Sequence, residues 1–444
     1  QSPCIAQGQA RGRVAVRRRF PFVRGWVGPF FDVIGRAWVG DGHAVFRMNF
    51  NGGDRLFWRL PGATDYLGTL TDWPGFLRAY LRRHDITDIM LFGDCRPLHE
   101  AALAVSREEG IRAYVFEEGY LRPDWVTLEQ EGVNGHSPLP KDPAYYRVVA
   151  GMLPPMPEHH GMPSSFRRRA LEGVAYNTAD LLTRWYFRHW RDYRPWSPLA
   201  EGIGWLRRLA QRTARLEESE RTIARIRGMG RPYMLFPLQL DADAQIRLHS
   251  NFRGITDAIE YVVESFANNA PSDQFLVIKE HPLDNGMRDW RKVVERAGRR
   301  HGVLGRIAYV PYGDILGLVR NARGVVTINS TTGTLALAEG IPVLCLGQSI
   351  YDMPGITHQT GLATFWRDPT MPDVETFGAF RRVLVEYCLV PGGFFSEKGL
   401  CALIAGVRER LSRGNDRNLP DPQIVRVLSG KALRTDFAAH GGRV

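Results

Sequence analysis

The sequence has 444 residues, a net charge of +11 and 44% hydrophobic residues. That hydrophobic fraction excludes a disordered chain and supplies sizeable cores, and the length allows two to three domains at roughly 100–200 residues each. No run of eighteen apolar residues occurs and residues 1–19 contain no apolar secretory signal, so we expect a cytoplasmic protein without a membrane-spanning helix.

The positive charge is concentrated in two segments. Residues 1–24 carry six arginines and no acidic residue, and residues 161–230 carry fourteen arginines against seven acidic residues. The rest of the chain is close to neutral. A local basic excess is typical of proteins that bind nucleic acid, anionic lipid or a phosphorylated substrate, and the composition leaves all three open.

After a basic arm at 1–19, strands alternate with helices. Strands are predicted at 20–23, 44–48, 89–93 and 112–116, and helices at 30–38, 71–84 and 100–110. This alternation predicts a parallel, doubly wound sheet over residues 20–150, the acceptor-side domain of the interpretation below.

The next segment, 151–230, reads as a Pro-rich linker followed by basic helices that Pro195 and Pro198 interrupt. A second alternating series then predicts a donor-side domain over 231–380, with strands at 233–236, 275–279, 307–310, 324–328 and 341–345. Residues 381–444 are expected to form C-terminal helices and a tail. The predicted fold class is α/β: two Rossmann-like domains facing a cleft, with a helical insert between them, as in GT-B enzymes.

Polar motifs follow several of these strands. Glu117 and Glu118 end one strand and precede Gly119 and Arg122. A carboxylate here could act as the nucleophile of a retaining sugar transfer, and alternation along a strand would point only one of the two into a cleft. The alternative is a solvated turn in which Arg122 forms a salt bridge.

The second domain carries three further motifs. One motif is Lys279-Glu280-His281-Pro282, in which His281 could contact a phosphate or an acid. The alternative is an ordinary loop, because a His-Pro dipeptide is common. The hydroxyl-rich turn at Ser330, Thr331 and Thr332 predicts an anion site at a helix N-terminus or an ordinary N-cap. Gln239, after the first strand of this domain, could contact a base or ribose or be a loop polar residue.

In the first domain, Asn51, Asp54 and Asp94 also follow strands. Together with Arg122 they are candidate acceptor-side residues or structural ones. Asp241 and Asp243 have the spacing of a DxD pair, but that spacing alone is weak evidence for a metal. The five cysteines show no CxxC spacing. We therefore predict no metal.

Together these motifs resemble the capsule polysaccharide biosynthesis/export family, most closely its KpsS-like branch. The residues that carry the resemblance over about 20–400 are Gly28-Pro29-Phe30-Phe31, Asn51-Gly52-Gly53-Asp54-Arg55, residues 116–123, Gly132-Val133-Asn134-Gly135, Pro237-Leu238-Gln239, residues 279–282 and residues 329–333.

The resemblance implies a retaining β-Kdo transferase that uses CMP-Kdo as donor substrate and no cofactor; Kdo is the acidic sugar 3-deoxy-manno-octulosonic acid. It also implies a phosphatidylglycerol-type lipid acceptor at the inner membrane, a partner transferase of the KpsC type and a capsule ABC exporter. Glu118 would be the nucleophile. The KpsC-type pattern has the shorter Asp at the position of Glu118, so Glu117 is the alternative nucleophile. His281 and the turn at 330–332 would meet the phosphate and the sugar carboxylate.

The basic insert fits an anionic membrane. Arginines and aromatic residues are interleaved there: Arg167, Arg168, Arg169, Arg184, Arg188, Arg191, Arg194, Trp185, Tyr186, Trp190, Tyr193 and Trp196. This pattern is typical of contacts with anionic lipid headgroups. The alternative is that the rings pack against the domains and the arginines are only solvated. We expect peripheral membrane attachment and no nucleic acid partner. Two alternatives stay open: another GT-B enzyme, such as a nucleotide-sugar epimerase or a transferase for a different sugar, and a non-catalytic export component.

Overall fold

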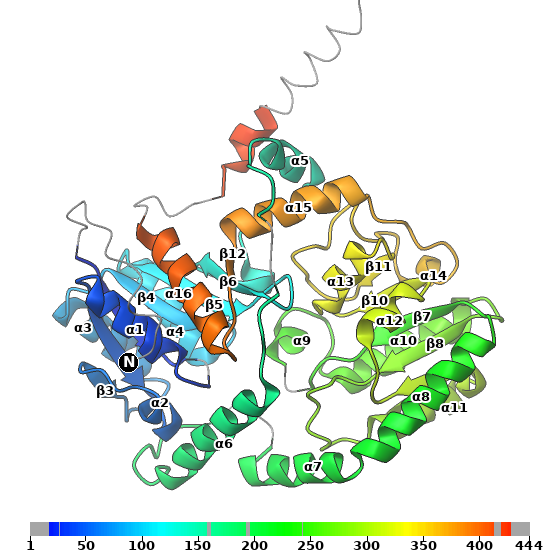
Figure 1. Cartoon of the computed structure of the whole chain (residues 1–444), viewed down its shortest axis with the longest axis horizontal. Helices are drawn as coiled ribbons and strands as arrows, with labels where there is room; N and C mark the ends of the chain where they lie inside the picture. The colour runs from blue at the N-terminus through cyan, green and yellow to red at the C-terminus, as the bar shows by residue number, and fades with distance from the viewer. Residues whose placement is uncertain are drawn as a thin grey trace, which may run out of the picture. The chain divides into compact units, whose positions relative to one another are not determined.

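A computed structural model describes residues 17–25, 27–157, 161–191, 196–241, 243–412 and 419–427. The chain divides into two compact units (Figure 1). The first comprises residues 1–138, 156–193 and 384–419, and the second comprises residues 139–155, 194–383 and 420–444. The segment expected as a linker and insert, 151–230, is thus shared between both units, and part of the C-terminal region belongs to the first.

The first unit is built on a seven-stranded sheet with the order β12-β6-β5-β4-β1-β2-β3. Strands β1 to β5 are parallel, whereas β6 pairs antiparallel with β5 and β12 pairs antiparallel with β6. The strands are β1 Arg19–Val23, β2 Ala44–Asn49, β3 Ala63–Asp65, β4 Asp88–Phe92, β5 Arg112–Glu118, β6 Trp125–Gln130 and β12 Leu389–Pro391.

Helices cover this sheet through an aromatic core. Phe20 and Phe22 of β1 stack on Trp38 at ring-centroid distances of 4.2 and 5.3 Å, so one helix face is fixed against the central strand. The helices are α1 Phe30–Gly40, α2 Gly52–Leu56, α3 Trp73–Arg83, α4 Pro97–Glu108, α6 Phe166–Leu182 and α16 Glu397–Ser412, with a 3₁₀ turn at Asn134–His136.

The second unit has a five-stranded, fully parallel sheet with the order β11-β10-β7-β8-β9. Its strands are β7 Tyr233–Pro237, β8 Phe275–Lys279, β9 Ile307–Val310, β10 Gly324–Thr327 and β11 Val343–Cys345. Its helices are α5 Pro143–Gly151, α7 Pro198–Ala210, α8 Arg212–Gly228, α9 Ala244–Leu248, α10 Ile255–Asn269, α11 Trp290–Arg300, α12 Ile315–Arg320, α13 Thr332–Ala338 and α14 Leu362–Phe365, with a 3₁₀ turn at Leu304–Arg306. Helix α15, Val374–Tyr387, runs from this unit into the first.

The predicted α/β class with parallel sheets is confirmed. Strands β3, β6 and β12 were not predicted: β3 and β12 have three residues each, too short to show a periodicity. Strand β6 lies outside every predicted strand, and its antiparallel pairing with β5 makes the first sheet mixed rather than wholly parallel. No helix in the part of the chain that the structure describes has the length and apolarity to cross a bilayer.

Candidate active site

Glu117 and Glu118 end β5 at the carboxyl edge of the first sheet. They pair with Thr127 and Val126 of β6, and both side chains are partly buried. The pleat separates their surroundings as expected. Glu117 Oε1 accepts the backbone N–H of Glu118 at 2.9 Å, and its other oxygen lies 3.4 Å from the place a Cβ on Gly93 would occupy.

Glu118 lies between two guanidinium groups. Arg122 Nη2 is 2.8 Å from Glu118 Oε2, and Arg169 Nη1 is 3.4 Å from Oε1. The side chain of Glu118 retains 23% of its accessible surface, so it is held in place and still reachable. A carboxylate fixed at a strand end by two cations suits a nucleophile. Arg122 therefore lies beside Glu118, at the end of β5.

The acceptor-side candidates Asn51 and Asp54 lie deep in the first unit, each 1% exposed. Asn51 caps α2 by accepting the N–H of Asp54 at 2.9 Å and donates to the Tyr176 hydroxyl at 2.9 Å. Asp54 pairs with Arg47 at 3.0 Å and accepts the N–H of Phe50 at 3.1 Å. Both side chains thus join α2 to β2 and α6, and neither presents its oxygens at the surface.

Asp94, the third acceptor-side candidate, follows β4 and is also 1% exposed. Its Oδ2 accepts the N–H of Val133 at 2.8 Å and lies 3.1 Å from Nδ1 of His136. Asp94 therefore anchors the Gly132–His136 segment at the same edge as Glu118. His136 itself keeps 49% of its side-chain surface.

In the second unit, Gln239 and Asn329 join the two loops where the strand order reverses. Gln239 Nε2 donates to Asn329 Oδ1 at 2.8 Å, and Asn329 N–H donates to Gln239 Oε1 at 3.1 Å. These loops follow β7 and β10, which are neighbours although β8 and β9 come between them in sequence. Ligands of doubly wound sheets bind at this type of switch point. Gln239 is 7% exposed, so its side chain holds the two loops together and is not presented at the surface.

Lys279 ends β8, and His281 follows it at the same edge. His281 Nδ1 accepts the N–H of Leu283 at 3.1 Å, so the proton of the neutral ring resides on Nε2. Lys279 donates to the carbonyls of Glu280 at 2.6 Å and Pro311 at 3.3 Å, and burial lowers its pKa to about 8. Pro282 is exposed beside His281. Lys279 thus supports the turn that presents His281.

Glu280, to which the sequence motif assigns no role, is the buried centre of this loop at 3% exposed. It pairs with Arg208 of α7, accepts the hydroxyl of Tyr309 from β9, and lies 3.7 Å from Arg215 of α8. Burial and the charge of Glu280 strongly raise the pKa of Tyr309. The His281 turn is therefore tied directly to α7.

Ser330, Thr331 and Thr332 open the short helix α13. Thr331 is the N-cap and makes no side-chain capping bond, whereas Ser330 Oγ accepts the N–H of Thr332 at 3.1 Å and donates to the Thr332 hydroxyl at 3.2 Å. Tyr351 donates to the Ser330 carbonyl. The three residues are partly buried, and they follow β10 at the edge that also carries Gln239 and His281.

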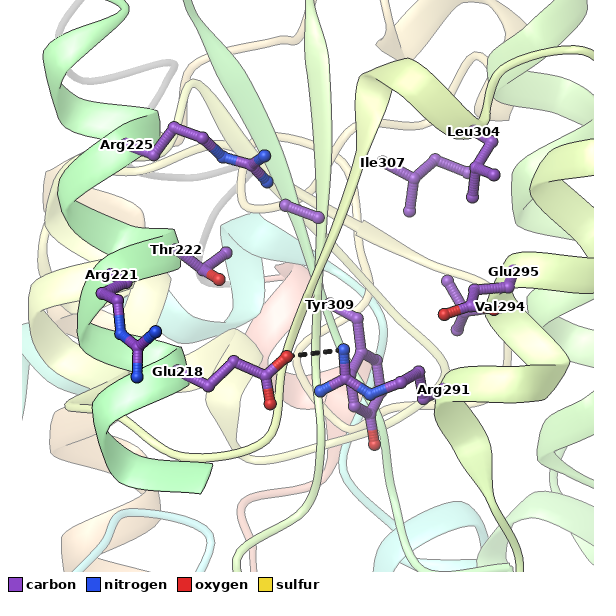
Figure 2. A pocket seen from close by; sticks show the side chains of 11 residues that line it. Glu218, Arg221, Thr222, Arg225, Arg291, Val294, Glu295, Leu304, Ile307 and Tyr309 are labelled. Carbon is purple, nitrogen blue, oxygen red and sulfur yellow. Dashed lines mark ion pairs between the residues drawn. The ribbon is translucent and has the colours of Figure 1, made fainter. Parts of the chain in front are cut away.

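A pocket of about 390 Å³ lies away from that edge, between α8, α11 and the edge strand β9 (Figure 2). Glu218 and Arg291 pair across it at 2.7 Å, and Arg221 and Arg225 of α8 also line it. None of the predicted donor residues lines this pocket. It is therefore distinct from the switch point.

The insert arginines divide into two kinds. Arg168 pairs with Glu172 at 2.8 Å and Arg169 turns toward Glu118, whereas Arg188 and Arg191 are exposed. Trp185 is 76% exposed, while Trp190 stacks on Arg24 at 4.3 Å. Tyr193 and Arg194 lie outside the described residues. The contact of Arg169 with Glu118 had no local signal, because 51 residues separate the two.

Comparison with known proteins gives a consistent family. Residues 87–395 match the family model described as "Capsule polysaccharide biosynthesis protein". The chain is 35% identical over 384 residues to the capsule polysaccharide export protein KpsS of Escherichia coli, covering 85% of this chain and 97% of that protein. It is 33% identical over 401 residues to the capsule polysaccharide modification protein LipB of Neisseria meningitidis, covering 84% and 91%.

A more distant likeness links the chain to a solved structure, the β-Kdo 2,7 transferase of KpsC from Thermosulfurimonas dismutans. It has 15% identity and a TM-score of 0.38, covering 82% of this chain and 89% of that one. A likeness at this level supports no statement about activity.

Proposed function

This chain belongs to the capsule polysaccharide biosynthesis protein family, and from that premise we propose that it is a retaining glycosyltransferase. In this proposal it moves β-Kdo from CMP-Kdo to a phosphatidylglycerol-type lipid, which starts the linker of a capsular polysaccharide. The observation that carries the proposal is the carboxylate of Glu118, held at the end of β5 by Arg122 and Arg169.

Glu118 would attack the anomeric carbon of the donor sugar as CMP departs with the bonding electron pair. The resulting glycosyl ester would then be attacked by the acceptor hydroxyl, whose proton passes to a base, and the carboxylate would be regenerated. Two displacements at one carbon retain its configuration. Arg122 and Arg169 would hold the free carboxylate in the attacking orientation before the first displacement.

The donor contacts are assigned to the second unit. The N–H at Nε2 of His281 would donate to the single phosphate of CMP, and the 330–332 turn would meet either that phosphate or the sugar carboxylate. Gln239 would set the shape of the switch point through Asn329. Since one phosphate carries less charge than a diphosphate, fixed donors would serve without a metal.

Peripheral attachment to the inner membrane is proposed from helix α7. Leu199, Ile203, Leu206 and Leu209 recur along it and are 61–68% exposed. On the opposite face, Arg208 pairs with Glu280, and a Cβ on Gly204 would lie 2.2 Å from the Asn285 carbonyl oxygen. An apolar stripe flanked by exposed Arg207 and Arg212 is typical of a helix lying in an anionic bilayer surface.

The direct test incubates the purified protein with CMP-Kdo and phosphatidylglycerol vesicles and analyses lipids by mass spectrometry. The expected product is phosphatidylglycerol bearing Kdo, with release of CMP in equal amount. If neither Kdo-lipid nor CMP forms from CMP-Kdo of verified activity, the proposal is wrong. A parallel binding measurement that favoured a UDP-sugar over CMP-Kdo would point instead to another nucleotide-sugar enzyme.

A further inference from the structure

Three arginines converge at the carboxyl edge of the first sheet. Arg24 directly follows β1, Arg47 lies in β2, and Arg96 follows β4 and precedes α4. Because β4, β1 and β2 are neighbours, the three side chains start from adjacent strands. The strand order also reverses between β1 and β4, which is where doubly wound sheets bind ligands.

Two of these guanidinium groups are buried with an unused nitrogen. Arg24 is 8% exposed and Arg47 is 3% exposed, and Nη1 of each finds no hydrogen-bond partner among the described residues. The other nitrogens of Arg47 are used: Nε donates to Asn49 at 3.2 Å and Nη2 to Asp54 at 3.0 Å. A buried charged donor without an acceptor is costly, so these two nitrogens point to an anion that binds there.

The surrounding backbone and rings hold this geometry. Trp190 stacks on the Arg24 guanidinium at 4.3 Å, and Arg24 itself has a φ of 29°. A Cβ on Gly25 would lie 2.7 Å from the Phe31 ring and 3.2 Å from Arg47 Nη1, so glycine lets the backbone pass close to that nitrogen. The two unused donors are thus fixed in position.

The charges near this cluster are not balanced. Asp54 and Glu117 act on Arg96, and Asp54 is already paired with Arg47. Asp32 also acts on Arg47, but it is paired with Arg36 at 2.7 Å. Burial, with the charge of Arg24, lowers the pKa of Arg96 to about 10. Burial and the same arginines lower the pKa of the buried His99 well below its usual value, so His99 is neutral. The N-terminus of α4 adds a further positive dipole end.

We propose that Arg24, Arg47 and Arg96 form a phosphate-binding site that takes the phosphodiester of the anionic acceptor. This inference rests on the proposed function and adds to it the group through which the acceptor is recognised. The Nη1 donors of Arg24 and Arg47 would contact phosphate oxygens directly, and Arg96 would contribute charge from the neighbouring strand end.

The site is tested by titration calorimetry without any donor sugar. The probes are a short-chain, water-soluble phosphatidylglycerol and inorganic phosphate. Arg24→Gln and Arg96→Gln should each weaken binding of the lipid about tenfold to a hundredfold. Arg24→Lys, which keeps the charge, should recover part of that loss. Arg83→Gln, which removes an exposed arginine of α3, should bind like the unaltered protein.

The outcomes separate the possible sources of the anion. Tight lipid binding with weak phosphate binding, both reduced in the glutamine variants, supports the acceptor assignment. Inorganic phosphate binding as tightly as the lipid would overturn it, as would unchanged lipid affinity in folded Arg24→Gln and Arg96→Gln proteins. Thermal unfolding confirms that each variant is folded.

Kinetics separate this site from the transferase proposal. If transfer occurs, Arg24→Gln should raise KM for the acceptor about tenfold or more and leave KM for CMP-Kdo unchanged. If no transfer occurs with any acceptor, the calorimetric result still decides whether the anion site exists. A raised KM for the donor instead would assign the cluster to the donor and contradict the inference.

Discussion

Arg169 of α6 reaches Glu118 at the end of β5, with 3.4 Å between Nη1 and Oε1. Arg169 belongs to the basic segment that the sequence assigned to membrane contact, and it also stacks on Phe395 at 4.8 Å. Within the first unit, α6 therefore contributes to the candidate active site. The same helix supplies Tyr176 to the buried Asp54 network, so α6 is integral to the fold of this unit.

Replacing the proposed nucleophile should abolish transfer. Glu118→Gln is expected to lower kcat about a thousandfold or more and to leave CMP-Kdo affinity within about threefold, because the amide keeps the size of the side chain but cannot form the glycosyl ester. The measurement is Kdo-lipid formation beside donor binding. Glu117→Gln is the matched control. If kcat falls further in Glu117→Gln than in Glu118→Gln, Glu117 is the nucleophile.

A second prediction concerns the orientation of that carboxylate. Arg169→Gln should reduce kcat about tenfold to a hundredfold with little change in KM, since it removes one of two guanidinium groups that hold Glu118. Arg168→Gln is the control, because the adjacent Arg168 pairs with Glu172 instead. Equal losses in the two variants would show that only the stability of α6 matters.

His281 should act on the donor. His281→Asn keeps a side-chain acceptor for the Leu283 N–H and removes the Nε2 donor. We expect kcat/KM for CMP-Kdo to fall about tenfold to a hundredfold while thermal stability stays the same. Steady-state kinetics with varied donor provide the measurement, and a variant with unaltered kinetics would remove His281 from the donor site.

The apolar stripe of α7 should govern membrane attachment. Replacing both Ile203 and Leu206 by Glu should weaken binding to phosphatidylglycerol vesicles at least about tenfold, because two exposed apolar side chains would no longer enter the interface. Vesicle sedimentation measures this effect. Val374→Glu, at a site that is 68% exposed on α15, is the control. Retained vesicle binding in the α7 double variant would contradict the assignment.

A further prediction concerns pH and the buried Glu129, which accepts hydrogen bonds from Tyr120 and from Ser137 at 2.6 Å. Burial raises its pKa from 4.5 to about 7. Since the folded pKa is raised, the stabilisation is complete below pH 4.5 and is lost as pH rises through 7. The loss should amount to roughly 3 kcal/mol.

Glu129→Gln should remove that slope, because the amide does not titrate. Urea unfolding at pH 5 and pH 8 measures the difference in the free energy of unfolding. Glu131→Gln, whose side chain is 58% exposed, is the control and should keep the slope of the unaltered protein. An unchanged slope in Glu129→Gln would assign the pH dependence to other groups.

The sequence alone determined the elements with a long enough pattern. Short apolar runs, separated by helical segments, predicted β1, β2, β4 and β5 and all five strands of the second sheet. Such runs are continuous because the strands of a parallel sheet are buried on both faces. It also placed Glu118, His281 and Ser330 after strands, since parallel strands bring their carboxyl ends to one edge. Family membership followed from the order and spacing of the same motifs, and the comparisons confirm it.

Only the tertiary structure decided which side chains meet. The Arg169–Glu118 pair, the Gln239–Asn329 bridge and the convergence of Arg24, Arg47 and Arg96 join residues from separate elements. No local pattern encodes such pairs, because strand order and helix placement set them. Burial was also decided there: Asn51 and Asp54 read like site residues in the sequence, but packing of α2 against α6 encloses them. A polar residue after a strand can face a ligand or hydrogen-bond to the backbone. The residues packed around its side chain in the folded protein decide which of these roles it has.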